Sequence, residues 1–476
     1  MVDTYATARS MLADLAAKKV SARELLEAHV ARNGQVAKAI NAVIAADLDR
    51  ARKDAAAIDD ARAKGSALGA LAGLPMTIKD GYDVENMPAT AGNPAFKDRA
   101  KDCADATVVR AARGAGAVIW GKTNVPVMLG DYQTFNVLHG TTNNPYDVTK
   151  VPGGSSGGAG AALASGVTPL EIGSDIGGSL RHPANYCGVT SLKTTWGSLD
   201  GRGHVPPRPD AYYECDIGVY GPMARSVDDL KLLWSMLCGT PEKPRQGVKG
   251  ARVAVWDEEA SWPLACDVRD GVRRAAAALE TSGAHVELAK PDIEGRELIE
   301  AYMSILIPII SVEYPDALLR SFEAMREADL KLVASGGEGV EAAAARLLSV
   351  PTYREYVAAL VRRQALKNRL AAFFARFDAI LMPIGMVPPF AHQQEPGFNE
   401  RVLDVDGVAV SYRAMLNWIS PASALHAPAL AVQAGQTPKG LPVGVQIVGP
   451  WHGEDRLFDL GFAVEEQLGG FRRPPI

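Results

Sequence analysis

Residues 173–181 read Gly-Ser-Asp-Ile-Gly-Gly-Ser-Leu-Arg, so that Ser179 directly follows two glycines. Glycines allow several backbone N–H groups to point at one position, because no side chain crowds the approach. Such a cluster of N–H groups suits an anion, and beside a nucleophilic hydroxyl that anion would be a tetrahedral oxyanion. The run therefore predicts a serine nucleophile whose oxyanion hole is built from the backbone of Ile176, Gly177, Gly178 and Ser179.

Two further motifs lie upstream. Residues 151–158 read Val-Pro-Gly-Gly-Ser-Ser-Gly-Gly, and residues 76–80 read Met-Thr-Ile-Lys-Asp. A serine hydroxyl is a weak nucleophile until a base takes its proton, and a lysine can act as that base only when it is neutral. Lys79 ends an apolar run, where burial would lower its pKa, so we predict a proton relay from the nucleophile through a second serine to Lys79. The plainer interpretation is an exposed Lys79 paired with Asp80.

We predict that the charged residues of the nucleophile run support the loop and do not transfer protons. Asp175 and Arg181 are expected to form a bidentate ion pair that holds the loop rigid. Residues 153–160 could instead be a phosphate cradle or a flexible turn. A phosphate loop of the Walker type ends in Gly-Lys-Ser/Thr, and this one continues into alanines.

Composition limits the class of protein. The chain has 476 residues, 47% of them hydrophobic and 22% charged, which suits one large α/β core with insertions or two domains. A net charge of −5 argues against nucleic acid as the main partner. The cysteines lack a C-x-x-C pair, and we expect five buried thiols in a reducing compartment. They are Cys103, Cys187, Cys215, Cys238 and Cys266.

The order of the predicted elements indicates an α/β fold. Strands at 74–78 and 117–120 flank a helix at 105–113, and strands at 251–256 and 284–288 flank a helix at 268–279, as in two βαβ units. Further strands are expected at 378–383 and 440–449, with a closing helix at 454–468. We expect an N-terminal helical segment over 1–65 and an α/β/α domain over 66–476 with a helix-rich insertion at about 291–377.

The N-terminal residues lack the apolar core of a secretory signal. The longest apolar run, residues 303–310, is interrupted by Pro308 and is too short to cross a bilayer. We therefore expect a cytoplasmic protein that does not bind membranes.

The three motifs together resemble the amidase signature hydrolases. That family is marked by a Gly-Gly-Ser-Ser-Gly-Gly loop, then Gly-Ser/Thr-Asp-x-Gly-Gly-Ser-Ile/Leu-Arg-x-Pro, with Ile-Lys-Asp upstream, and all three occur here in that order. The resemblance implies a mixed central β-sheet between layers of α-helices, and a Ser-cisSer-Lys triad. In that triad Ser179 would be acylated, Ser155 in a cis peptide would bridge the proton, and Lys79 would be base and later acid. The loops would be supported by Ser156, Asp175 and Arg181. The reaction would need no cofactor and no metal.

Some positions depart from the family pattern. Residues 124–128 lack the Glu-Phe that many members carry after the proline, and residues 425–428 stand where a Gly-x-Pro turn is usual. These departures leave the triad intact and leave the substrate open. By position, Leu129, Asp131 and Tyr132 would line the acyl pocket. Trp418 and His426 would either edge that pocket or pack in the core.

The function that the resemblance implies is an amidase, which hydrolyses a carboxamide C–N bond through an acyl-enzyme on Ser179 and should react with esters too. The alternative is an amidotransferase subunit that works with partner proteins on misacylated tRNA. The acidic balance, and Ile176 where that branch usually has threonine, favour the amidase. The expected partners are a small-molecule amide and a second copy of the chain, with neither nucleic acid nor membrane. A non-catalytic scaffold is disfavoured because all three triad positions are present.

Overall fold

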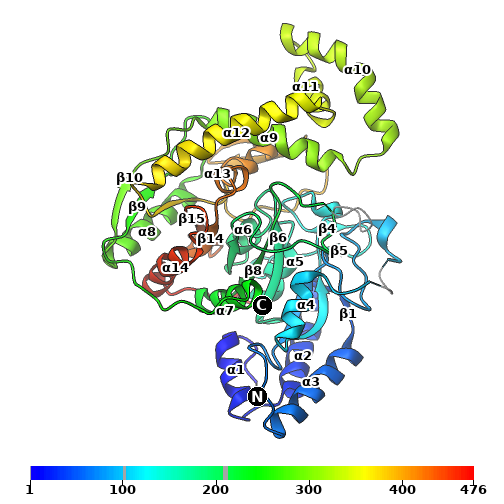
Figure 1. Cartoon of the computed structure of the whole chain (residues 1–476), viewed down its shortest axis with the longest axis vertical. Helices are drawn as coiled ribbons and strands as arrows, with labels where there is room; N and C mark the ends of the chain where they lie inside the picture. Colours follow the sequence, from blue (N-terminus) through cyan, green and yellow to red (C-terminus); the bar gives the residue numbers. More distant parts are fainter. Residues whose placement is uncertain (1, 100–102, 207–212) are drawn as a thin grey trace.

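The computed structural model describes residues 2–99, 103–206 and 213–476 (Figure 1). Its N-terminal part consists of three helices, α1 (Ala8–Ala16), α2 (Ala22–Ile40) and α3 (Leu48–Ala63). At the start of α2 the Ser21 side chain accepts from the Glu24 N–H, and Glu24 reaches back to Ser21, so that two otherwise unpaired amides are satisfied. The apolar face of α2 is buried against the rest of the chain, as its sequence pattern predicts.

The first predicted βαβ unit is present and ends at the motif lysine. Strand β2 (Pro75–Lys79) runs parallel to β3 (Val118–Thr123), and helix α4 (Thr107–Gly114) connects them. Strand β1 (Val43–Ala46) pairs antiparallel with the other edge of β3. Every residue of β2 is buried, because helices and a neighbouring strand cover the apolar run from both sides.

The large sheet has eight strands in the order β10-β9-β11-β15-β14-β7-β8-β6. The first three run parallel to one another and every later pair is antiparallel, so the sheet is mixed. The second predicted βαβ unit lies at one edge, where α8 (Cys266–Thr281) connects β9 to β10. The strand bounds are β6 (Leu170–Asp175), β7 (Thr190–Lys193), β8 (Val219–Ala224), β9 (Arg252–Val255), β10 (His285–Leu288), β11 (Ala379–Pro383), β14 (Ala429–Gln436) and β15 (Pro442–Val448).

Helices cover both faces of this sheet, because successive strand residues point to opposite sides. On β15, Val443 packs against Gly271 of α8 (Cys266–Thr281), and on β14 Leu430 packs against α14 (Glu454–Leu468) on the same face. Gly444 points the other way, and its N–H donates to Asn185 of α6 (Arg181–Tyr186). The mixed sheet between helical layers is therefore confirmed.

The helix-rich segment after β10 contains α9 (Gly295–Ser311), α10 (Asp316–Ser335), α11 (Val340–Ser349) and α12 (Tyr353–Phe374). In Figure 1, α10 and α11 project away from the sheet, whereas α9 and α12 lie against the body. Tyr302 of α9 donates to the Ile176 carbonyl oxygen at 2.6 Å, so this segment reaches the predicted nucleophile loop.

Shorter elements complete the fold: β4 (Phe135–Asn136), β5 (Gly140–Thr141), α5 (Gly157–Ala164), α7 (Val227–Cys238), β12 (Val402–Val405), β13 (Val408–Ser411), α13 (Ser420–Ala424), and the 3₁₀ turns η1 (Pro94–Phe96), η2 (Val127–Leu129) and η3 (Tyr412–Leu416). Within the described ranges, no helix combines the length and apolar character needed to traverse a bilayer.

The five cysteines are unpaired, but the prediction that all are buried is wrong. Only Cys187 is buried; Cys266 is exposed and the other three are partly exposed. Cys266 is the first residue of α8, and a helix start at the surface leaves its side chain in solvent.

Candidate active site

Two strand ends and two helix starts meet at the candidate site. β2 ends at Lys79 and β6 ends at Asp175, and these two strands pack side by side. The glycine-rich loop of residues 151–156 leads into α5, and residues 176–180 lead from β6 into α6. Residues at the ends of strands are held by the sheet behind them, so their side chains are placed precisely.

Lys79 is fully buried, and its amine meets hydroxyl groups. Its Nζ lies 2.8 Å from Ser155 Oγ and 3.0 Å from Ser174 Oγ. Burial lowers the pKa of Lys79 to about 7, although the negative charges of Asp175 and Glu171 act in the opposite direction. The alternative of an exposed Lys79 paired with Asp80 is wrong, because Asp80 forms its ion pair with Lys122 at 2.8 Å.

The loop that carries Ser155 is glycine-rich because it packs tightly against its neighbours. A Cβ on Gly154 would overlap the Asp131 carbonyl oxygen, and a Cβ on Gly158 would overlap the Asn124 backbone nitrogen. The loop is buried throughout, and the peptide bond between Gly154 and Ser155 is cis. These contacts favour close packing over the flexible turn considered for this stretch.

Ser179 lies beside the Ser155 loop. Its carbonyl oxygen accepts from the Ser156 N–H at 3.2 Å, and the residue is buried, with 7% of it exposed. The Ser156 hydroxyl also lies 3.5 Å from the Ser174 carbonyl oxygen. The two glycine-rich loops are therefore fastened to each other through Ser156.

Asp175 and Arg181 form the expected ion pair within the nucleophile loop. Both Asp175 oxygens accept from the Arg181 guanidinium, at 3.0 and 3.1 Å, and both side chains are buried. Asp175 also accepts from the N–H groups of Gly178 and Leu180. The Gly178 N–H is thus already bonded, so the prediction that it points at the oxyanion is wrong. The remaining candidates for the oxyanion hole are the amides of Ile176, Gly177 and Ser179.

Two buried carboxyl groups near Lys79 have opposite pKa shifts. Burial raises the pKa of Glu171 to about 7, against the effect of a hydrogen bond from Thr77. Burial acts in the same direction on Asp175, but the Arg181 guanidinium outweighs it and holds the pKa of Asp175 well below its usual range. Asp175 is therefore a fixed negative charge, and Glu171 is the carboxyl that titrates in the same range as Lys79.

Tyr132 is a pocket candidate that lies near the nucleophile loop. Its Oη lies 3.9 Å from the position that a Cβ on Gly177 would take, and Tyr302 Oη lies 3.7 Å from the same position. Leu129 lies with its Cδ1 close to Gly81, which follows Lys79 by two residues in the chain. Asp131 is occupied, because Arg401 at 2.6 Å and Tyr412 at 2.7 Å both donate to it.

Trp418 and His426 have contacts that favour the core-packing interpretation. Trp418 is 1% exposed, and its indole N–H donates to the Pro263 carbonyl oxygen. His426 is stacked on Trp196 with ring centroids 4.6 Å apart, and its Nε2 lies 2.8 Å from Asp216 Oδ1. Asp216 also binds a guanidinium of α12, so this histidine helps to hold the helix-rich segment on the core.

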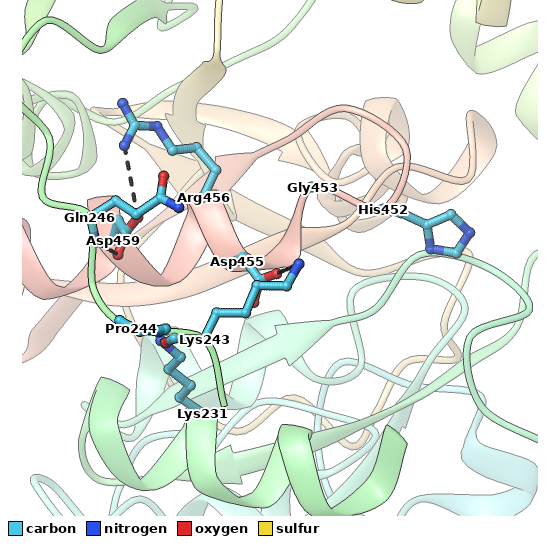
Figure 2. A pocket seen from close by; sticks show the side chains of 9 residues that line it. All are labelled: Lys231, Lys243, Pro244, Gln246, His452, Gly453, Asp455, Arg456 and Asp459. Atoms are coloured by element: carbon cyan, nitrogen blue, oxygen red, sulfur yellow. Dashed lines mark hydrogen bonds and ion pairs between the residues drawn. The ribbon is translucent and has the colours of Figure 1, made fainter. Parts of the chain in front are cut away.

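A cavity of about 230 Å³ lies elsewhere, at the start of α14 (Figure 2). Two of its lining cations are paired with acids, since Lys243 lies 2.7 Å from Asp455 and Arg456 lies 3.8 Å from Asp459, and Lys231 donates to the Lys243 carbonyl oxygen. None of the predicted catalytic residues lines it. This mixed lining selects no ligand chemistry.

Two side chains near Lys79 were not predicted from the sequence, namely those of Ser174 and His204. Ser174 Oγ lies 3.0 Å from Lys79 Nζ and 2.8 Å from His204 Nε2. Ser174 stands inside the quoted motif, and a serine before the aspartate of a strand end was a signal that could have been used. His204 lies in a Gly- and Pro-rich stretch of no regular spacing, and nothing in the sequence pointed to it.

Fold and site together define an α/β protein in which two glycine-rich serine loops meet a buried lysine. The chain belongs to the amidase family, because the model of that family, described as "Amidase", matches residues 24–458. The site residues lie within that matched range.

Relatives in this family include amidotransferase subunits as well as hydrolases. The chain is 28% identical to a glutamyl-tRNA(Gln) amidotransferase subunit of Alkaliphilus metalliredigens, over 96% of this chain and 95% of that protein. It is 32% identical to an indoleacetamide hydrolase of Bradyrhizobium diazoefficiens, over 98% of this chain and 86% of that one.

Solved structures share the fold over nearly the whole chain. A 6-aminohexanoate cyclic dimer hydrolase, solved with its substrate, superposes with a TM-score of 0.82 at 26% identity, and covers 100% of this chain and 99% of that one. A bacterial aryl acylamidase of the amidase signature family superposes with a TM-score of 0.81 at 23% identity, and covers 97% and 96%. At that identity the second comparison speaks for the fold alone.

Proposed function

We propose that this protein is an amidase that hydrolyses the C–N bond of a small carboxamide through an acyl-enzyme on Ser179. The observation that carries the proposal is the buried Lys79 amine, 2.8 Å from the Ser155 hydroxyl, with a pKa of about 7. An amine of that pKa is largely neutral slightly above pH 7, where it can accept a proton. The hydrolase relatives support the same reaction.

The proposed reaction moves one proton along the two hydroxyls. Ser179 Oγ attacks the carbonyl carbon, its proton passes to Ser155 Oγ, and the Ser155 proton passes to Lys79 Nζ. The carbonyl oxygen becomes an oxyanion that accepts from the amides of Ile176, Gly177 and Ser179. Loss of one such donor typically costs about 3 kcal/mol of transition-state stabilisation.

Collapse of that intermediate breaks the C–N bond. Lys79 returns its proton through Ser155 to the leaving nitrogen, which departs as ammonia or an amine. Water then attacks the acyl-enzyme by the same route and releases the acid. Esters would react as well, because they form the same tetrahedral intermediate.

The test is covalent labelling with a fluorophosphonate and turnover of a panel of amides. Ser179→Ala should abolish labelling and lower amide turnover by about 10⁴-fold or more, because no other group replaces the nucleophile. The matched control is Ser165→Ala, another buried serine, whose hydroxyl donates to the Ala161 carbonyl oxygen at the end of α5. Labelling that survives in Ser179→Ala at another serine would remove Ser179 from this role.

A second candidate function rests on the amidotransferase relative that matches 96% of this chain. In that case the chain would release ammonia within a complex and would need partner proteins for full activity. Gel filtration of the protein from its own cells would separate the two. A monomer or homodimer that turns over free amides supports the amidase, and a larger complex whose activity is lost on dissociation supports the amidotransferase.

A further inference from the structure

His204 ends a chain of hydrogen bonds that begins at Ser155. Ser155 Oγ lies 2.8 Å from Lys79 Nζ, which lies 3.0 Å from Ser174 Oγ. Ser174 Oγ in turn lies 2.8 Å from His204 Nε2, and His204 Nδ1 lies 2.7 Å from the Pro206 carbonyl oxygen. These are ordinary hydrogen-bond distances, so each link has one donor and one acceptor.

The carbonyl at the far end decides the direction of every link. A carbonyl oxygen only accepts, so His204 Nδ1 carries the proton that it donates to Pro206. Burial and the charge of Lys79 lower the pKa of His204 to about 3, so the ring is neutral and its Nε2 has no proton. Nε2 must therefore accept from the Ser174 hydroxyl.

With its hydrogen committed to His204, Ser174 Oγ can offer only lone pairs to Lys79. A neutral lysine has two N–H bonds and one lone pair. Ser174 takes the N–H bonds, one at Oγ and one, more weakly, at its carbonyl oxygen 3.5 Å away. The lone pair is then left facing the third neighbour, the Ser155 hydroxyl.

We propose that His204 is a positioning residue that, through Ser174, directs the lone pair of neutral Lys79 at the Ser155 hydroxyl. This inference rests on the proposed function, because it assigns Lys79 the part of a base. Without the acceptor at Nε2, the Ser174 hydroxyl can rotate and donate to Lys79. That rotation would occupy the lone pair and leave Ser155 without a base.

The surroundings of His204 make it a stable fixture. Its ring lies between Tyr82 and Tyr220, with centroids 4.9 and 5.1 Å away. Among the described residues, the charged side chains that act on it are Lys122 and, when protonated, Lys79, and both cations keep the ring neutral by lowering its pKa. Lys79 itself also faces the negative charges of Asp175 and Glu171.

The experiment compares His204→Asn with His204→Gln in the full-length protein. The Asn amide reaches only the position of Nδ1, whereas the longer Gln can place an oxygen at the position of Nε2 and accept from Ser174. The rate of fluorophosphonate labelling at Ser179 is measured against pH, because it reports nucleophile activation whatever the natural substrate is.

His204→Asn should lower the plateau rate about tenfold, the usual effect of losing one buried hydrogen bond. It should also move the acid limb to lower pH. A Ser174 hydroxyl that donates to neutral Lys79 stabilises the uncharged form, and this lowers the pKa of the amine. His204→Gln should restore most of the rate and return the limb to its original pH.

A double-mutant cycle makes the route through Ser174 testable. In the Ser174→Ala background, His204→Asn should change neither plateau nor limb, because the hydroxyl through which it acts is gone. An equal further loss in that background would overturn the inference, as would an unshifted limb in His204→Asn. If wild-type protein is not labelled at Ser179 at all, the proposed function fails instead, so the two failures are distinguishable.

Discussion

Two buried lysines in this protein have the same pKa and different surroundings. Lys79 at the end of β2 and Lys193 at the end of β7 are both fully buried, and burial lowers the pKa of each to about 7. Lys79 Nζ meets the hydroxyls of Ser155 and Ser174. Lys193 Nζ donates to the carbonyl oxygens of Thr194 at 3.1 Å and Ala427 at 2.8 Å.

The difference shows that a lowered pKa does not by itself make a lysine a base. A base needs a neighbour with a proton to give, and a hydroxyl has one whereas a carbonyl oxygen does not. Lys193 therefore fastens β7 to the segment before β14, in either charge state. The structure thus offers an internal control for Lys79, with matched burial and matched pKa.

The largest expected effect separates these two lysines by rate. Lys79→Met should lower fluorophosphonate labelling of Ser179 by about 10³-fold, within the range for loss of a general base. Lys193→Met should leave the rate within about threefold of wild type, because the carbonyl neighbours of Lys193 have no proton to give. A threefold change in rate corresponds to less than about 1 kcal/mol. Methionine keeps the length and apolar stem in both variants. A comparable loss in folded Lys193→Met would show that the contrast in neighbours does not decide the chemistry.

The next effect is in the pH dependence. Lys79 must lose its proton to act, so the labelling rate of wild-type protein should rise with pH, reach half its maximum near pH 7, and then level off. Lys193→Met should keep this midpoint. Residual activity in Lys79→Met should instead rise steadily into the alkaline range as hydroxide replaces the amine.

Glu171 needs its own control, because its pKa is also raised to about 7 by burial. Glu171→Gln should keep an acid limb, moved to lower pH because the nearby negative charge that favours protonated Lys79 is gone. Disappearance of the limb in Glu171→Gln, with a midpoint retained in Lys79→Met, would assign the titration to the carboxyl.

Most of the fold could be predicted from sequence because local sequence patterns indicate its strands and helices. The run ending at Lys79 is apolar between glycine and turn signals, and the closing helix was expected over 454–468 and is found at Glu454–Leu468. The pairing order of the eight strands could not be predicted, since the two neighbours of β14, which are β7 and β15, come from segments far apart in the chain. Register across such pairs depends on packing that no local pattern records.

The site was predictable as far as its motifs are contiguous. Lys79 and Ser155 were expected to share a proton, and the structure brings them to hydrogen-bond distance. Gly178 was expected to offer its amide to the oxyanion, but its N–H reaches Asp175, because the turn folds back on the strand end. His204 was missed because it lies outside the three motifs, and only the folded chain brings it to Ser174.

A further expected effect is on stability, where the two lysines should behave alike. A lysine with a pKa of 10.5 in the unfolded chain and about 7 in the fold binds more protons when unfolded, throughout the pH range between these values. The free energy of unfolding should therefore rise as pH increases from about 7 to 10.5, by up to about 1.4 kcal/mol per pH unit for each such lysine. Lys193→Met should make that rise shallower, and Lys79→Met should do so by a similar amount, as measured by urea unfolding at several pH values. A slope that changes in only one variant would mean that the two amines are not matched in the fold, and the rate comparison between them would lose its control.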